Sequence, residues 1–165
     1  MNGKNGKKLL WALTLFVLAG TSALAAGKND GLSAATHKEL AQARSATARY
    51  HDIAQAEADG YVNTGFYEPG EGFHWLKESL IDANFDPEQP ETLLYAPVPG
   101  EERLQLVAVE YVVPVALSPG APAGFTGDAD IWLEQSEAPG LWLLSAWIWE
   151  HNPTGIFASK NPRVP

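Results

Sequence analysis

The chain has 165 residues, a formal net charge of -9 from 20 Asp+Glu and 11 Lys+Arg, and no cysteine. The acidic balance argues against nucleic acid and anionic membrane surfaces as partners, because binding to either depends on basic patches. The absence of cysteine excludes disulfides, thiolate metal ligands and thiol nucleophiles.

The first 26 residues predict an export signal. They contain a basic start, an apolar run and a small-x-small cleavage motif, at residues 4–8, 9–18 and 23–25. Cleavage near Ala25 or Ala26 would leave an exported protein, periplasmic or extracellular, with a net charge of about -12. The apolar run is shorter than the roughly 20 residues that span a bilayer, so we expect no membrane association after cleavage.

The rest of the chain has the length of one domain. Residues 27–35 are expected to form a linker and residues 36–165 a single domain. Within it, residues 37–59 predict a long helix. Thr36 and Glu39 match a capping box, Gly60 is a C-terminal stop, and the apolar positions form a narrow stripe rich in alanine.

The region after this helix predicts mostly strands. Residues 61–75 are expected to form two extended segments about a turn at 68–72, and residues 76–85 a short helix. A hairpin follows, with strands near 91–97 and 103–113 about the turn at 99–102. After a Pro/Gly loop at 116–130, residues 131–135 predict a short strand, residues 136–140 a turn, and residues 141–149 a strand that is apolar on both faces.

One helix followed by a mostly antiparallel sheet indicates an α+β domain, with the helix packed on one face. We favour a cystatin-like or NTF2-like topology, and a ferredoxin-like arrangement is the second choice.

Glu110 is the first candidate site residue. In a regular strand it shares a face with Leu104, Leu106, Ala108 and Val112, where it is the sole charge. A buried carboxylate must be paired, hydrogen-bonded, bound to a cation or protonated. The alternatives are a site and a strand end that reaches water or an arginine.

His74 stands between Phe73 and Trp75 after a glycine turn, where an aromatic wall could present its imidazole. The alternative is a partly buried histidine satisfied by one backbone bond. His51 is expected on a solvated helix flank, and His37 on the surface.

His151 ends the segment "LWLLSAWIWEHNPTG". In a continuous strand His151 and Ser145 would lie about 20 Å apart, at about 3.3 Å per residue. They could share a ligand only if the strand breaks before His151, and Asn152 and Pro153 favour such a break. Trp147 is a candidate pocket, core or interface residue.

The chain contains no HExxH, GxSxG, P-loop or GxGxxG motif, so no nucleotide cofactor is expected. The segments "ATARYHDIAQAEADGYVNTG", "GFHWL", "FDPEQPETLLYAP", "LQLVAVEYVVP" and "WIWEHNPTGIFASKNPRV" resemble a family of exported bacterial proteins of unknown function. The resemblance covers residues 46–164 and implies one exported domain without an assigned activity. It also implies that His74, Glu110 and His151 occupy polar positions of the family pattern, and that Ser145 stands where relatives carry histidine.

Three hypotheses follow. The first is an exported acidic domain that binds a small ligand or a divalent metal ion, with His74, Trp75, Glu110, Trp147 and His151 around the ligand, and His74, Glu110 and His151 as the metal candidates. The second is a cofactor-free acid/base enzyme using Glu110 and His74 in an NTF2-like pocket. The third is a homo-oligomeric structural protein without a ligand. The sequence favours a role without catalysis.

Overall fold

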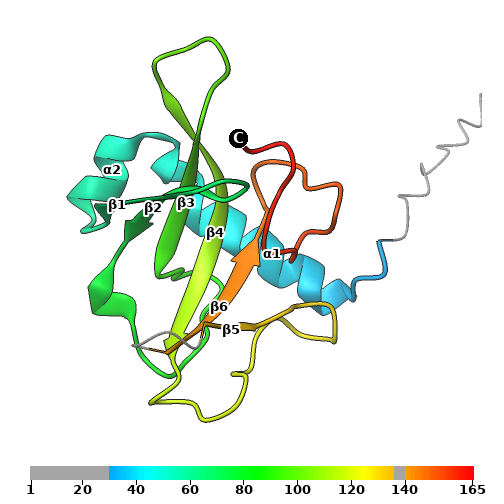
Figure 1. The fold of residues 1–165 in the computed structure, drawn as a ribbon. Helices are drawn as coiled ribbons and strands as arrows, with labels where there is room; N and C mark the ends of the chain where they lie inside the picture. The colour runs from blue at the N-terminus through cyan, green and yellow to red at the C-terminus, as the bar shows by residue number, and fades with distance from the viewer. Residues whose placement is uncertain (1–29, 136–139) are drawn as a thin grey trace, which may run out of the picture.

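The computed structural model describes residues 30–135 and 140–165. The predicted export signal, the first residues of the predicted linker and most of the turn at 136–140 lie outside this range. The described residues form one helical layer and one six-stranded sheet in which all neighbouring strands are antiparallel (Figure 1). The predicted α+β class is confirmed. No helix among the described residues has the length and apolar character needed to cross a membrane.

The first four strands of the sheet lie side by side in chain order, and the last two lie in reversed order. The order is β1-β2-β3-β4-β6-β5, formed by β1 (Val62–Glu68), β2 (Gly72–Leu76), β3 (Thr92–Pro97), β4 (Leu104–Pro114), β5 (Leu133–Gln135) and β6 (Leu141–Ala146). Strand β6 therefore pairs with β4, and β5 forms the edge. A single 3-10 turn, Glu78–Leu80, connects β2 to β3 where a short helix was expected. The predicted hairpin of β3 and β4 and the extended pair of β1 and β2 are confirmed.

The helical layer is not the single helix predicted over 37–59. It consists of α1 (Ala34–Thr47), a 3-10 turn (Ala48–His51) and α2 (Ile53–Ala58). The break falls at Asp52, whose backbone is extended and whose side chain accepts a hydrogen bond from Ala54 N as the cap of α2. The hydroxyl of Tyr95 in β3 donates to the carbonyl of Tyr50 at 2.6 Å. The backbone of the 3-10 turn is therefore hydrogen-bonded to the sheet just before the break.

The start of α1 also differs from the prediction. Ser33, not Thr36, is the N-cap, and its Oγ accepts from Thr36 N at 3.0 Å. Thr36 instead donates its hydroxyl to the carbonyl of Thr126. Glu39 accepts from the backbone and hydroxyl of the same threonine. The predicted capping box is therefore used to attach the 116–130 loop to the helix.

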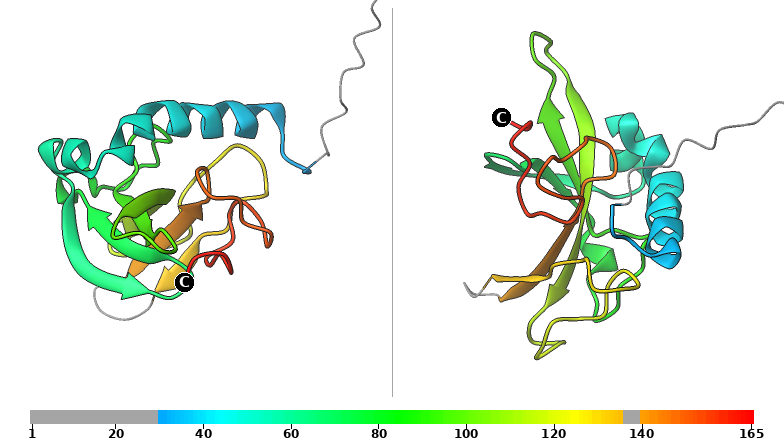
Figure 2. Two further views of the ribbon diagram at one scale, coloured as in Figure 1. Left: turned by 90° about the horizontal axis from the view of Figure 1, so that it is seen from above. Right: turned by 90° about the vertical axis from the view of Figure 1, so that its right-hand side faces the viewer.

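The two faces of the sheet bury different clusters. The face under α1 carries the main core, which includes Leu40, Trp75, Tyr95, Tyr111 and Leu144. The opposite face, here called the far face, carries a smaller cluster of Leu94, Ala96, Val107, Ala108, Trp147 and Val164. Figure 2 shows α1 on one side of the sheet and the C-terminal segment on the other.

A bulge in β4 sets which residues reach the far face. Leu94 pairs with Ala108 while Tyr95 pairs with Leu106, so Val107 is an extra residue in β4. An extra residue shifts the alternation by one position. The predicted single face from Leu104 to Val112 is therefore wrong: Leu104 and Leu106 pack under the helix, whereas Ala108 belongs to the far-face cluster.

The strand predicted over 141–149 ends earlier, at Ala146. Trp147 N donates to the carbonyl of Ile156, and the amides of Trp149 and Glu150 both donate to the carbonyl of Val107. The chain therefore leaves the β4 ladder three residues before the predicted strand end at 149, and the bulge residue Val107 binds the amides that follow.

Candidate functional site

A cavity of about 640 Å³ lies on the far face and is lined by residues of both edge strands, β1 and β5. Strands from opposite edges can line one cavity only where the sheet curves, as Figure 2 shows. Its apolar wall consists of Phe66, Leu76, Ile81, Val112, Leu141 and Leu143. The volume falls within the range of pockets that bind small molecules.

Three ionisable side chains meet in this cavity. His74 Nε2 lies 3.5 Å from Glu71 Oε2 and 4.0 Å from Glu110 Oε2. One donor atom from each of the three residues lies within 4.8 Å of the other two. His74 is 8% exposed and Glu110 is 5% exposed, so two of the three groups are buried.

Two members of this cluster, Glu71 and His74, belong to the hairpin of β1 and β2. Glu71 N donates to Glu68 O at 2.9 Å across a turn in which Gly70 has φ +85, as expected for the third position of a type II turn. In β1, the three residues 64–66 stand opposite His74 alone, because the register shifts between Asn63 and Tyr67. This bulge of three residues against one places the ring of Phe66 beside the imidazole.

The phenyl ring of Phe66 covers His74, with 5.1 Å between the ring centroids. Thr64 Oγ1 donates to the carbonyl of His74 at 3.1 Å. The hydrogen bond from Thr64 joins β1 to β2. The ring of Phe66 lies between the imidazole and solvent, because Phe66 is 53% exposed whereas His74 is 8% exposed. The Nδ1 atom of His74 is buried, and Nε2 is the atom that faces the two carboxylates.

Glu110 is delivered by β4, where it pairs with Thr92 of β3 and Ser145 of β6. Ser145 Oγ lies 3.5 Å from Glu110 Oε1 and is its hydrogen-bond partner in the described chain. Lys160, which also lines the cavity, forms its ion pair with Glu68 instead. No lysine or arginine of the described residues forms an ion pair with Glu110.

Burial and neighbouring charges together set the pKa values of Glu110 and His74. It raises the pKa of Glu110 to about 7, although the positive charge of protonated His74 and the hydroxyl of Ser145 oppose this shift. Burial acts to lower the pKa of His74, but Glu71 and Glu110 outweigh it and hold the pKa above its usual value. Each of the two buried groups thus favours the charged form of the other.

The other predicted site residues lie elsewhere. Trp75 points to the helix side, where its ring packs against Tyr95 in the main core. Trp147 belongs to the far-face cluster and donates Nε1–H to the carbonyl of Ala158. His151 is exposed and lines a second cavity, of about 520 Å³, together with Trp147. The structure brings His74 and Glu110 together but not Trp75 or His151 with them.

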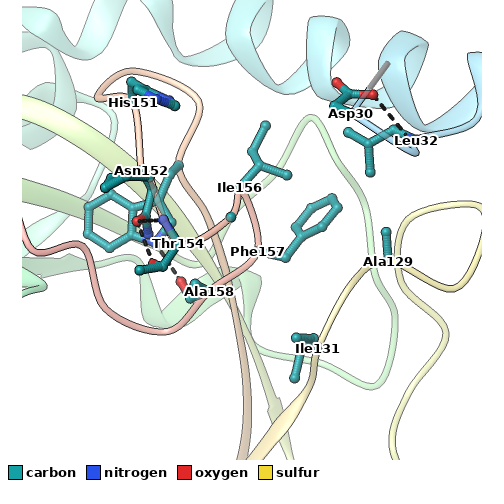
Figure 3. Close-up of a pocket in the computed structure, with 13 residues that line it drawn as sticks. Asp30, Leu32, Ala129, Ile131, His151, Asn152, Thr154, Ile156, Phe157 and Ala158 are labelled. Carbon is teal, nitrogen blue, oxygen red and sulfur yellow. Dashed lines mark hydrogen bonds between the residues drawn. The ribbon is translucent and has the colours of Figure 1, made fainter. Parts of the chain in front are cut away.

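The second cavity lies between the start of the helical layer, the 129–131 segment and the C-terminal loop (Figure 3). Asn152 organises that loop: its amide donates to Lys160 O, and its Oδ1 accepts from the backbone and hydroxyl of Thr154. His151 is the one histidine among its lining residues, and no acidic side chain forms an ion pair with it in the described chain.

Glu71 is the member of the cluster that the sequence interpretation missed. Its position in a predicted turn concealed it, because a turn glutamate is ordinarily solvated. A signal did exist in the three-residue spacing from His74, since a turn residue and a strand residue at that separation can share a face after a glycine such as Gly72. Comparisons of the chain with protein-family models, with curated proteins and with solved structures find no match. The resemblance to exported bacterial proteins therefore stays a prediction.

Proposed function

We propose that the protein binds a small molecule in the far-face cavity, with an apolar body against the wall and a polar group at the His74–Glu110 end. The observation that carries this proposal is the placement of two buried ionisable groups in an otherwise largely apolar cavity. Apolar walls with a few convergent polar groups are typical of ligand sites, where the polar groups fix the orientation of the ligand.

The topology supports the favoured fold prediction more than the second one. The helix precedes all six strands in the described chain, and β1 to β4 follow one another without an intervening α-helix. A ferredoxin-like arrangement alternates helices between its strands. The helix before a meander supports a cystatin-like or NTF2-like description, and export to the periplasm or the outside remains the predicted location.

Ligand binding is tested by thermal unfolding in the presence of a panel of small apolar and aromatic compounds. A ligand that binds the folded state raises the midpoint by mass action. We expect Leu143→Gln, which places an amide in the wall, to abolish the shift. Leu117→Gln is the matched control, because Leu117 is 54% exposed and does not line the cavity. Absence of a shift with every compound, or an equal shift in both variants, would contradict the proposal.

The other two hypotheses stay predictions. An acid/base enzyme requires a partner within about 3 Å or joined through one water. His74 Nε2 and Glu110 Oε2 lie 4.0 Å apart, beyond a direct hydrogen bond, and the geometry specifies no reaction. For an oligomer, Trp147 is a poor probe because it is 3% exposed within the single chain. Light scattering with a charge placed at Ile131 or Leu133, which are 55% and 45% exposed, is the sharper test of an interface.

A further inference from the structure

We propose that Glu71, His74 and Glu110 form a binding site for one divalent transition-metal ion, such as Zn²⁺, at the polar end of the far-face cavity. Within residues 30–135 and 140–165 this is the one group of three histidine and acidic side chains whose donor atoms all lie within 4.8 Å. The three residues come from the β1–β2 turn, β2 and β4, so the site is assembled by the sheet and not by one local segment.

The separations fit a metal with a small adjustment. Donors about 2.0 to 2.2 Å from a tetrahedral ion lie about 3.4 Å from one another. The 3.5 Å and 4.0 Å separations from His74 Nε2 to the two carboxylates are close to this value. Glu71 is the least buried of the three, with 17% of its side chain exposed, so it can supply the remaining movement.

The Oε2 atom of Glu110 is a second indication, because the one hydrogen bond of this carboxylate in the described chain is to Oε1. This carboxylate is 5% exposed, and its Oε2 accepts no hydrogen bond among the described residues, although it lies toward His74 Nε2 at 4.0 Å. Buried carboxylates require a partner, because desolvation of the charge is costly. An ion between Oε2 and Nε2 would supply that partner.

Charge favours a divalent cation over an anionic occupant. Two carboxylates belong to the cluster, and when both are ionised one divalent ion balances their two negative charges. Lys160, the one lysine or arginine in the lining of the cavity, is paired with Glu68. The imidazole nitrogen favours Zn²⁺ or a neighbouring transition metal over Mg²⁺ or Ca²⁺, which prefer sites made of oxygen donors.

A three-donor site has a consequence for the cavity. Zinc with three protein ligands keeps a position for water or a ligand atom. Because all three residues line the cavity, that position is available to a polar group of a bound molecule. This last step rests on the proposed ligand-binding function, whereas metal binding itself does not.

The test is calorimetric titration of the chelator-treated protein with ZnCl2, in the absence of any organic ligand, alongside MgCl2. We expect one Zn²⁺ per chain and much weaker Mg²⁺ binding. Glu71→Gln, His74→Gln and Glu110→Gln should each lower the Zn²⁺ affinity by about tenfold or more, as loss of a group that holds a metal does. The matched controls are His151→Gln and Glu102→Gln, which change a histidine and a glutamate outside the cluster.

Lack of Zn²⁺ binding by the unaltered protein overturns the proposal, and so does an affinity unchanged by Glu71→Gln and His74→Gln. Far-UV circular dichroism establishes that each variant is folded. If substitution of buried His74 or Glu110 prevents folding, Glu71→Gln decides, because its side chain lies at a turn and is partly exposed. Failure of the compound panel with retained Zn²⁺ binding would remove the ligand proposal alone, and the reverse result would remove the metal site alone.

Discussion

Glu110 and Ser145 are direct cross-strand partners on β4 and β6, with Ser145 Oγ 3.5 Å from Glu110 Oε1. Residue 145 therefore stands beside the metal cluster, on the side of Glu110 that His74 does not occupy. His151, which the sequence suggested as a metal ligand, lies in the lining of the other cavity. Beside this proposed ligand of the ion the chain thus has a hydroxyl and not an imidazole.

Ser145→His is expected to raise the Zn²⁺ affinity by about tenfold or more, because its imidazole offers a fourth donor beside Glu110 and zinc sites commonly use four donors. Calorimetric titration measures the change. Ser145→Asn is the matched control, since it also enlarges a buried polar side chain but offers no imidazole. Equal affinity in both variants would show that residue 145 does not reach the ion.

The sequence predicted the parts of the fold that depend on local pattern. Alternating apolar residues with the Pro99–Gly100 turn predicted the β3–β4 hairpin, and the glycine turn at 68–72 predicted the β1–β2 pair. The bulge at Val107 left no trace in the pattern, because Val107 and Ala108 are both apolar and both buried. A one-residue shift between two apolar faces cannot be detected from hydrophobicity alone.

Local sequence pattern also explains which site residues could be predicted and which could not. His74 and Glu110 were found because an ionisable residue among apolar strand residues is conspicuous. Both His74 and Trp75 were expected around the ligand, although consecutive strand residues point to opposite faces and the alternation alone could have separated them. The choice of Ser33 over Thr36 as helix cap could not be predicted, because both are good caps and the distant Thr126 decides between them.

Glu91 predicts a pH dependence of stability that is separate from the metal cluster. Burial raises its pKa to about 7, with Asp82 and Asp86 adding to the shift and Val112 N opposing it. Between the ordinary value of 4.5 and about 7 the folded protein retains a proton that the unfolded chain has lost. The free energy of unfolding should therefore fall as pH rises through this window, by at most about 3 kcal/mol from this residue.

Glu91→Gln should reduce that fall, because an amide can still accept from Val112 N, 2.9 Å from Glu91 Oε2, and carries no charge. Urea unfolding at several pH values between about 5 and about 8 measures the difference. Glu110 contributes to the slope in both proteins and cancels in the comparison. The exposed Glu102→Gln should leave the slope unchanged, and a slope unaltered by Glu91→Gln would contradict the prediction.

Tyr95→Phe is expected to destabilise the protein by about 1 to 3 kcal/mol, since it leaves the carbonyl of Tyr50 without its side-chain donor in the core. The ring of Tyr95 is fully buried and its hydroxyl lies 2.6 Å from that carbonyl. Tyr67→Phe removes a hydroxyl whose hydrogen bond is exposed and should cost less. Urea unfolding of both variants tests this order, and an equal loss would mean that the contact at the helix break contributes little.

Gly72→Ala should both destabilise the fold and weaken Zn²⁺ binding. Gly72 has φ +98, and a Cβ there would lie 2.4 Å from Tyr95 O, so the backbone between Glu71 and His74 would have to move. Gly100 is the matched control, because it has φ +78 with nothing within 4 Å of its Cβ. Each alanine introduces backbone strain of about 1 to 3 kcal/mol, but Gly72→Ala adds the clash. Urea unfolding should show the larger loss for Gly72→Ala, and zinc titration should show a loss for this variant alone. If the two alanine variants lose equal stability and keep equal zinc affinity, the close approach of β2 to β3 does not position the cluster.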